Sequence, residues 1–446
     1  MIKVSIIMPS LNVAGYIREC MESAVQQTMK EIEIICVDAG STDGTRKILQ
    51  EYAQRDNRIS IIDSNVKSYG MQVNMGIMAA KGEYIAILET DDYVLNDMYE
   101  KLYGIAQKNA LDYVMADFKS FYDDAETGRN FFEAHALAGR QDLYHKVLTL
   151  KDHAHLYGVD DSTLWRGIYA RSFLLANGIR LNETPGAAYQ DICFMHRVRM
   201  NAVRSMYINE FGYCYRTDRD GSSINSVKGL QYARYEYQYL LEHDDIPPIY
   251  MGKALYMMSS AFVGECINLL PRTNYSWEKE DEECYEWFKM ILTDAIKEGQ
   301  LTESMGEQEW WRSLGILLTS KEDFVRRVRA VSKNYEEIKH IFLSEPMVII
   351  CGAGMRGRGL VRRLKKDEVF NGRTTILFAD NNQKIWNSHV DGVQVLSVCS
   401  CADKNPKAVY VIANKTHGAH IREQLVAEGI SEEKIYEYKP FYNFID

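Results

Sequence analysis

Several classes of protein are excluded by what this chain has little of. Its 446 residues include 8 prolines and 29 glycines, too few for a collagen-like or low-complexity chain. Lysine and arginine number 52 against 62 aspartates and glutamates, a formal net charge of −10, so the broad basic surface of a dedicated nucleic-acid binder is not expected. Apolar residues make up 46% and charged residues 26%, which is typical of a globular protein.

Paired cysteines and long apolar runs are also missing. The nine cysteines contain no C-x-x-C pair, which predicts neither a zinc site nor a disulfide framework and fits a reducing, cytoplasmic setting. The apolar run at the N-terminus is short and stops at Pro9, and Lys253 and Glu265 interrupt the run over residues 250–270. We therefore expect no signal peptide and no transmembrane segment, which leaves association with the inner face of a membrane open.

Strand and helix patterns alternate through the first hundred residues. Apolar, β-branched runs predict strands at 4–8, 32–37, 59–62 and 84–88, with amphipathic segments between them. This alternation indicates an α/β fold with an open, mostly parallel sheet, in which ligands bind at the carboxyl ends of the strands. Polar loops beginning at Pro9, Asp38 and Glu89 follow three of these strands.

Three acids, Glu89, Asp91 and Asp92, directly follow the fourth predicted strand. Carboxylate oxygens are the ligands that Mg²⁺ and Mn²⁺ prefer, and Mg²⁺ commonly takes one or two of them while substrate phosphates supply the rest. A solvated turn is the usual explanation for an isolated pair of aspartates. The position at the ligand edge of the sheet favours a metal site instead.

Four motifs occur in order in the same region, with the sequences VSIIMPSLN, VDAGSTDG, AKGEYI and ETDD at residues 4–12, 37–44, 80–85 and 89–92. Together with residues 164–169, 182–186, 189–191 and 213–216, they resemble a family 2 glycosyltransferase with a GT-A fold, up to around Ser226. The resemblance implies transfer of a sugar from a nucleotide-sugar donor, expected to be a UDP-sugar. It also implies inversion at the anomeric carbon and a Mn²⁺ or Mg²⁺ cofactor.

The resemblance assigns roles to individual residues. Asp191 matches the general base, which accepts the proton of the acceptor hydroxyl. Asp92 is the first candidate for metal ligand and Asp91 the second, the metal stabilising charge on the departing diphosphate. The donor-binding set is Pro9, Ser10, Asn12, Asp38, Asn74, Glu89, Asp91 and Arg216.

Two positions depart from the family pattern. Ala39 stands where a second acid commonly reads the base, and Val73 stands where an arginine commonly precedes the asparagine. These departures favour the alternative hypothesis of a non-catalytic scaffold or sensor that binds sugar nucleotides. For the enzyme, the family implies a glycan or lipid-linked acceptor in bacterial surface polysaccharide synthesis. Homo-oligomerisation is left open.

A second motif begins near the C-terminus. Gly352, Gly354 and Gly357 follow a predicted strand and open a predicted helix, and Asp380 ends the next strand. This spacing is typical of a dinucleotide-binding turn and resembles a compact Rossmann-like module appended to some sugar-transfer enzymes. Packing, dimerisation or nucleotide sensing are the alternative roles. An NAD(P)-dependent oxidoreductase is a further alternative, although no Tyr-x-x-x-Lys pair follows the turn.

The chain is thus predicted to have three parts. Residues 1–226 would form the GT-A domain, residues 227–345 a mainly helical middle region, and residues 346–446 the Rossmann-like module. The last boundary rests on Pro346, after which a helical pattern gives way to a strand.

Overall fold

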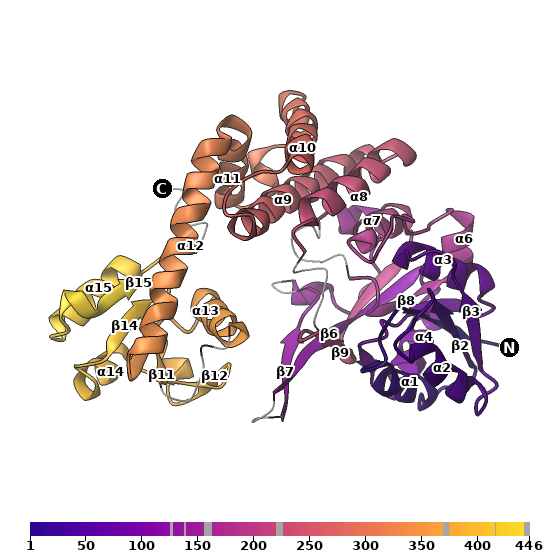
Figure 1. The fold of residues 1–446 in the computed structure, drawn as a ribbon, viewed down its shortest axis with the longest axis horizontal. Helices are drawn as coiled ribbons and strands as arrows, with labels where there is room; N and C mark the ends of the chain where they lie inside the picture. The colour runs from indigo at the N-terminus through magenta and orange to yellow at the C-terminus, as the bar shows by residue number, and fades with distance from the viewer. Residues whose placement is uncertain are drawn as a thin grey trace. The chain divides into compact units, whose positions relative to one another are not determined.

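The structure of the protein is a computed structural model. The structure describes residues 1–124, 128–137, 140–155, 163–219, 226–367, 369, 374–414 and 416–440. It divides into two compact units, residues 1–269 with 278–306, and residues 270–277 with 307–446, which are described separately below (Figure 1). Within the described ranges, no helix has the length and apolar character needed to cross a membrane.

The first unit is built around a nine-stranded mixed sheet. Its strand order is β3-β2-β1-β4-β8-β6-β9-β5, and β7 pairs with β6. Strands β1 to β4 are parallel, whereas β8 runs antiparallel to β4 and to β6. The strands are β1 Val4–Ser10, β2 Ile32–Asp38, β3 Ile59–Asp63, β4 Tyr84–Ile87, β5 Tyr93–Val94, β6 Tyr113–Asp124, β7 Gly128–Ala134, β8 Gly167–Ala170 and β9 Ser205–Arg216.

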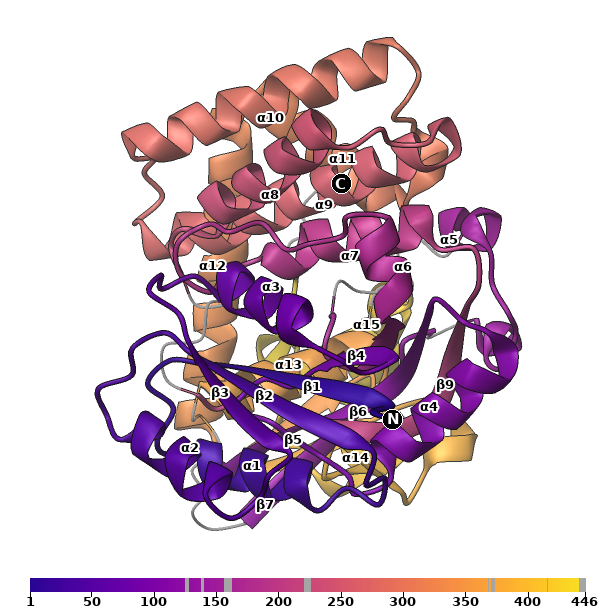
Figure 2. The same ribbon diagram turned by 90° about the vertical axis from the view of Figure 1, so that its right-hand side faces the viewer.

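Helices cover both faces of this sheet. In Figure 2, α3 lies on the face opposite to α1 and α2. Every residue of β1 is buried, as a central parallel strand between two helical layers requires. The helices of this unit are α1 Ile17–Val25, α2 Thr45–Ala53, α3 Tyr69–Ala79, α4 Met98–Asn109, α5 Leu150–His155, α6 Arg171–Ala176, α7 Gln190–Asn201, α8 Gly229–His243, α9 Pro248–Arg272 up to residue 269, and α10 Lys279–Lys297.

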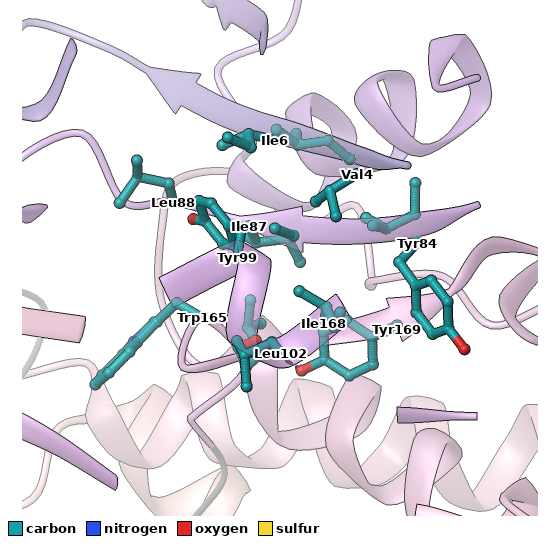
Figure 3. Packing of buried hydrophobic residues seen from close by; sticks show 14 of the residues in the cluster. Val4, Ile6, Tyr84, Ile87, Leu88, Tyr99, Leu102, Trp165, Ile168 and Tyr169 are labelled. Atoms are coloured by element: carbon teal, nitrogen blue, oxygen red, sulfur yellow. Dashed lines mark hydrogen bonds between the residues drawn. The ribbon is translucent and has the colours of Figure 1, made fainter. Parts of the chain in front are cut away.

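The core of the first unit continues across the antiparallel half of the sheet. Figure 3 shows Val4 and Ile6 of β1 beside Ile87 of β4, with Ile168 of β8 beyond them. These side chains belong to one cluster of buried apolar residues. The strands that carry the polar loops are therefore anchored in a continuous core.

The second unit holds a separate, six-stranded sheet. The strand order is β12-β13-β11-β10-β14-β15, all parallel except β12. Its strands are β10 Met347–Cys351, β11 Thr375–Ala379, β12 His389–Val390, β13 Val393–Leu396, β14 Val409–Ile412 and β15 Ile435–Glu437. Its helices are α11 Gln308–Thr319, α12 Lys321–Ser344, α13 Met355–Lys366, α14 Val398–Lys404 and α15 Gly418–Ala427.

Candidate active site

The ends of β1, β2 and β4 meet at one edge of the first sheet. Parallel pairing sets Ser10 beside Asp38 and Ile7 beside Ile87, so the loops that follow these strands leave the sheet together. The side-chain amide of Gln72, on α3, donates hydrogen bonds to the carbonyl oxygens of Ser10 (2.9 Å) and Val37 (2.7 Å). One buried side chain thereby holds the ends of β1 and β2 side by side.

The loop after β2 is stabilised by two of the predicted donor-binding residues. The Asp38 carboxylate accepts hydrogen bonds from the backbone N–H groups of Gly40 and Ser41 and from the Ser41 hydroxyl. The Asn12 side-chain oxygen accepts a hydrogen bond from the backbone N–H of Thr42 (2.9 Å). Both side chains therefore shape the loops that line the sheet edge.

Pro9 and Ser10 act through their backbone. The Pro9 carbonyl accepts a hydrogen bond from the Thr90 hydroxyl (2.9 Å), and the Ser10 carbonyl accepts one from the Ala39 N–H (3.0 Å). The loops after β1, β2 and β4 are thus bonded to one another. Ala39 is buried beneath this junction, at 3% exposure.

The acid Asp92 is enclosed by strand β9. It is 1% exposed, and its two oxygens accept hydrogen bonds from the Tyr213 hydroxyl (2.7 Å) and from the backbone N–H of Arg216 (2.7 Å). Burial, with the nearby Asp91 charge, raises the pKa of Asp92 well above its ordinary value. Both oxygens are therefore engaged in holding the acidic loop to β9.

Glu89 and Asp91 lie nearer the surface. The Asp91 carboxylate accepts a hydrogen bond from the Arg219 guanidinium (2.9 Å), a pair whose side chains are 16% and 33% exposed respectively. The Glu89 carboxylate accepts one from the Tyr69 hydroxyl. The pKa of Glu89 is raised to about 8, mainly by burial and in part by the Asp91 and Asp191 charges. Among the described residues, Arg219 is the partner of the Asp91 carboxylate, so a cation could reach Asp91 by replacing that partly exposed guanidinium.

Arg216, the last residue of β9, holds the acidic loop by a hydrogen bond. Its Nε donates a hydrogen bond to the Asp91 carbonyl oxygen (3.1 Å), and its guanidinium lies 4.6 Å from the centre of the Phe121 ring. The guanidinium also pairs at 3.0 to 3.2 Å with the carboxylates of Glu19, Asp123 and Asp218. Its contacts in this structure are thus with the protein, although the sequence predicts a donor-binding role.

Asp191 lies in the first turn of α7, and the segment before that helix is fastened to α3. The Asn74 side chain both donates to the Leu181 carbonyl (2.9 Å) and accepts from the Leu181 N–H (3.0 Å). The Tyr69 N–H donates to the Gly186 carbonyl (2.8 Å). Asn74, another predicted donor-binding residue, therefore positions the segment that carries the predicted base.

Asp191 and the acidic loop belong to the same electrostatic neighbourhood. The Asp191 charge raises the pKa of Glu89, and also that of Tyr69. The pKa of the Tyr215 hydroxyl is raised by all four acids, Glu89, Asp91, Asp92 and Asp191, after the larger effect of burial. The predicted base and the predicted metal ligands are thus brought together from positions about a hundred residues apart in the chain.

Aromatic residues to which the sequence alone assigned no role line this region. The Trp165 ring stacks on Tyr213 (4.3 Å between centres) and on Tyr215 (5.1 Å). Figure 3 shows Trp165 at the edge of the core cluster. Tyr213 and Tyr215 are two residues apart in a strand and so share one face, a signal that the sequence did contain.

The acids fit a hard cation that takes few protein ligands. Within the described part of the chain, no three His, Cys, Asp or Glu side chains form a group that could hold a metal ion. Mg²⁺ commonly uses one or two carboxylates and completes its shell with water and substrate phosphates. Asp91, with a partly exposed carboxylate at the sheet edge, meets that requirement, whereas Asp92 is 1% exposed and its two oxygens accept hydrogen bonds from β9.

In the second unit, the glycine-rich turn joins β10 to α13. Gly352 has φ +113°, and a Cβ on Gly357 would lie 1.9 Å from the Gly352 carbonyl oxygen, so both positions require glycine for the backbone itself. The space around Gly354 is open. The Asp380 carboxylate accepts hydrogen bonds from the N–H groups of Ala353 and Asn382, both at 2.8 Å. The four predicted residues are brought together, with Asp380 bonded to the turn.

The family of this chain follows from its similarity to known proteins. The model of "Glycosyl transferase family 2" matches residues 5–157. Glycosyltransferase GlyG of Streptococcus pneumoniae is 32% identical over 235 residues, which are 52% of this chain and 76% of that protein. The putative glycosyltransferase EpsH of Bacillus subtilis is 38% identical over 264 residues, 59% of this chain and 69% of that protein.

This chain belongs to glycosyltransferase family 2. Among solved structures, this glycosyltransferase is similar in fold to residues 1–349 of TarS from Staphylococcus aureus, with a TM-score of 0.51 and 18% identity over 74% of this chain and 91% of that fragment. The predicted family, the GT-A fold and the transferase class are therefore confirmed.

Proposed function

We propose that this family 2 enzyme is a metal-dependent, inverting glycosyltransferase that moves a sugar from a UDP-sugar to a hydroxyl of a glycan or lipid-linked acceptor. The observation that carries the proposal is that Tyr69 joins the two acidic elements: its hydroxyl donates a hydrogen bond to Glu89, and its N–H donates one to Gly186, just before the helix that carries Asp191. Of the similar proteins, TarS has been solved with UDP-GlcNAc, and a Bacillus spizizenii protein 27% identical over 65% of this chain is a poly(ribitol-phosphate) beta-glucosyltransferase. These names support surface polysaccharide synthesis as the setting, and we propose the inner face of the membrane as the place.

In this proposal Asp91 is the protein ligand of Mn²⁺ or Mg²⁺, and Asp92 has a structural role. Asp91 keeps its carboxylate at the sheet edge, while Asp92 holds the loop against β9 through both oxygens. This proposal departs from the sequence-based assignment, which named Asp92 as the first candidate for metal ligand and Asp91 as the second. When bound, the metal supplies Lewis-acid stabilisation of the charge on the departing nucleoside diphosphate.

The chain's own residues orient the two substrates. The loops that begin at Pro9, Asp38 and Glu89 would form the nucleotide pocket, and their mutual hydrogen bonds fix its shape. Asp191 would accept the proton of the acceptor hydroxyl on its carboxylate as that oxygen attacks the sugar carbon. Asn74, Ser10 and Asn12 contribute by holding these loops in place.

Two site variants and one control variant test the proposal. Nucleotide release is measured with Mn²⁺ and a panel of nucleotide sugars for the wild type, Asp91→Asn and Asp191→Asn. Asp294→Asn, an exposed position on α10, is the matched control. We expect loss of turnover in the two site variants and wild-type turnover in the control. Wild-type turnover in Asp91→Asn would refute the metal role, and transfer retained by Asp191→Asn would refute the base.

A second candidate function rests on Ala39 and Val73, the departures from the family pattern. In that hypothesis the chain binds a sugar nucleotide without transferring the sugar. Binding of a UDP-sugar with no transfer to any acceptor would support it. We also propose the glycine-rich turn in the second unit as a separate nucleotide site. The test is to titrate the full chain and its Gly354→Val variant with NAD(P) and with UDP, and to compare their binding.

A further inference from the structure

One buried carboxyl in the first unit has no part in the proposed mechanism. Glu236 lies in the middle of α8 and is 1% exposed. Its Oε1 accepts a hydrogen bond from the Asn182 side-chain amide (3.1 Å), while its Oε2 is buried and has no hydrogen-bond partner among the described residues. A half-satisfied carboxyl inside a protein is costly, so its presence calls for an explanation.

The neighbours of Glu236 belong to the structure that carries Asp191. Asn182 lies in the segment before α7, and its carbonyl oxygen is so close to α3 that a Cβ on Gly70 would lie 1.9 Å from it. Helix α8 packs against α7, and both the Asp191 charge and the backbone amide of Cys193 act on the Glu236 carboxyl. Glu236 therefore contacts the support of the predicted base from the side of the helical region.

Helix α8 is itself held by the next helix. The Glu265 carboxylate, on α9, lies at the N-terminus of α8, where a Cβ on Gly229 would be 2.0 Å from its Oε2. Its Oε1 accepts a hydrogen bond from the hydroxyl of Tyr189, the residue that directly precedes α7. Because α9 contacts both the start of α8 and the start of α7, movement of Glu236 relative to Asp191 is restricted.

We infer that Glu236 is a positioning residue for Asp191: it fixes the Asn182 segment and the first turn of α7, and so the direction in which the base faces the acceptor hydroxyl. The inference rests on the proposed function, in which Asp191 is the base. It also extends the functional part of the chain into the helices beyond residue 226, outside the region that the family model matches.

The charge state of Glu236 supports this role. The pKa of Glu236 is raised to about 8: burial is the main cause, the Asp191 charge adds to it, and the Asn182 side chain and the Cys193 amide act in the opposite direction. Glu236 is thus neutral at pH 7 and adds no charge beside the base. The titratable and charged groups that other elements bring against α8 include Asp191, Cys193, His196, Arg197 and Arg199 of α7, Glu265 of α9, and Asp281 and Cys284 of α10.

The test compares the pH dependence of kcat for the wild type, Glu236→Gln and Glu236→Ala in the full-length enzyme. Glu242→Gln, the same change at an exposed position of α8, is the control. We expect the wild-type kcat to fall above about pH 8, as Glu236 ionises beside Asp191, and the Gln variant to lack this fall. In Glu236→Ala, kcat should drop about tenfold to a hundredfold with the KM for the nucleotide sugar unchanged, because only the base loses its support.

The outcomes separate this inference from the proposed function. If Asp191→Asn abolishes transfer while Glu236→Gln keeps the wild-type alkaline fall and Glu236→Ala keeps the wild-type kcat, the inference is wrong and the base stands. Transfer retained by Asp191→Asn would overturn both. Should Glu236→Ala fail to fold, the pH profile of the Gln variant decides alone, with nucleotide-sugar binding as the check on its folding.

Discussion

Gly70 offers a direct test of how the base is held. It lies in the first turn of α3, and a Cβ at this position would meet the Asn182 carbonyl oxygen at 1.9 Å and its carbonyl carbon at 2.9 Å. Real Cβ atoms do not approach backbone this closely, so Gly70→Ala must push the Asn182 segment away from α3. That segment is bonded to Asn74 on one side and leads to Asp191 on the other.

The expected magnitude follows from two opposing effects. Alanine gains about 1 kcal/mol over glycine inside a helix. Forcing a methyl group into packed structure costs about 1–3 kcal/mol and more where backbone must move. We expect Gly70→Ala to lower the free energy of unfolding by about 1–3 kcal/mol and to reduce kcat about tenfold or more, since small displacements of a catalytic group are costly.

The matched control is Gly104→Ala, on α4. A Cβ there meets nothing within 4 Å, so this variant should gain about 0.5–1 kcal/mol of stability and keep the wild-type kcat. Urea unfolding and steady-state kinetics of the two variants give the comparison. If Gly70→Ala were as stable and as active as Gly104→Ala, α3 would not be restraining the Asn182 segment, and the positioning of Asp191 through that segment would be refuted.

Four further outcomes are expected. Asp92→Asn should lower the free energy of unfolding by about 1–3 kcal/mol in urea, since it disturbs a buried pair of hydrogen bonds. EDTA should abolish turnover, and Mn²⁺ should restore it in the wild type but not in Asp91→Asn. In Arg216→Met, the Asp123 carboxyl loses one of its two arginine partners, so NMR titration should find its pKa raised from about 2. The folded protein binds the Glu236 proton more tightly than the unfolded chain does, because the pKa of this carboxyl is raised to about 8, mainly by burial. The contribution of Glu236 to the free energy of unfolding is therefore complete below about pH 4.5 and is lost as the pH rises to about 8. Above pH 8, urea unfolding should find Glu236→Gln more stable than the wild type, by at most about 5 kcal/mol.

The local features of the fold were predictable because they depend on local physics. Apolar β-branched runs gave the starts of β1, β2 and β4, and parallel pairing then placed the acidic loop at the ligand edge. The hydrogen-bond partner of each site side chain was not predictable, because these bonds join residues that are distant in the sequence. Asp92 and its partner Tyr213 are 121 residues apart, and Asn74 and Leu181 are 107 residues apart.

The same limit explains what the sequence missed in the helices. From the sequence alone, Glu236 and Glu265 would be taken for solvent-exposed charges of amphipathic helices. The hydrogen bonds they make to Asn182 and Tyr189 show that both side chains are directed inward, toward the segment around the start of α7. A pattern with a 3.6-residue period predicts a helix and its buried face, but not which loop that face covers.

The bridge made by Gln72 has a kinetic consequence. Its two hydrogen bonds join the carbonyls of Ser10 and Val37, so the ends of β1 and β2 cannot separate unless both bonds break. The ends of these two strands therefore have their positions before any donor arrives. Encounter with a nucleotide sugar should then proceed at a rate set by diffusion and charge rather than by the opening of these two strands.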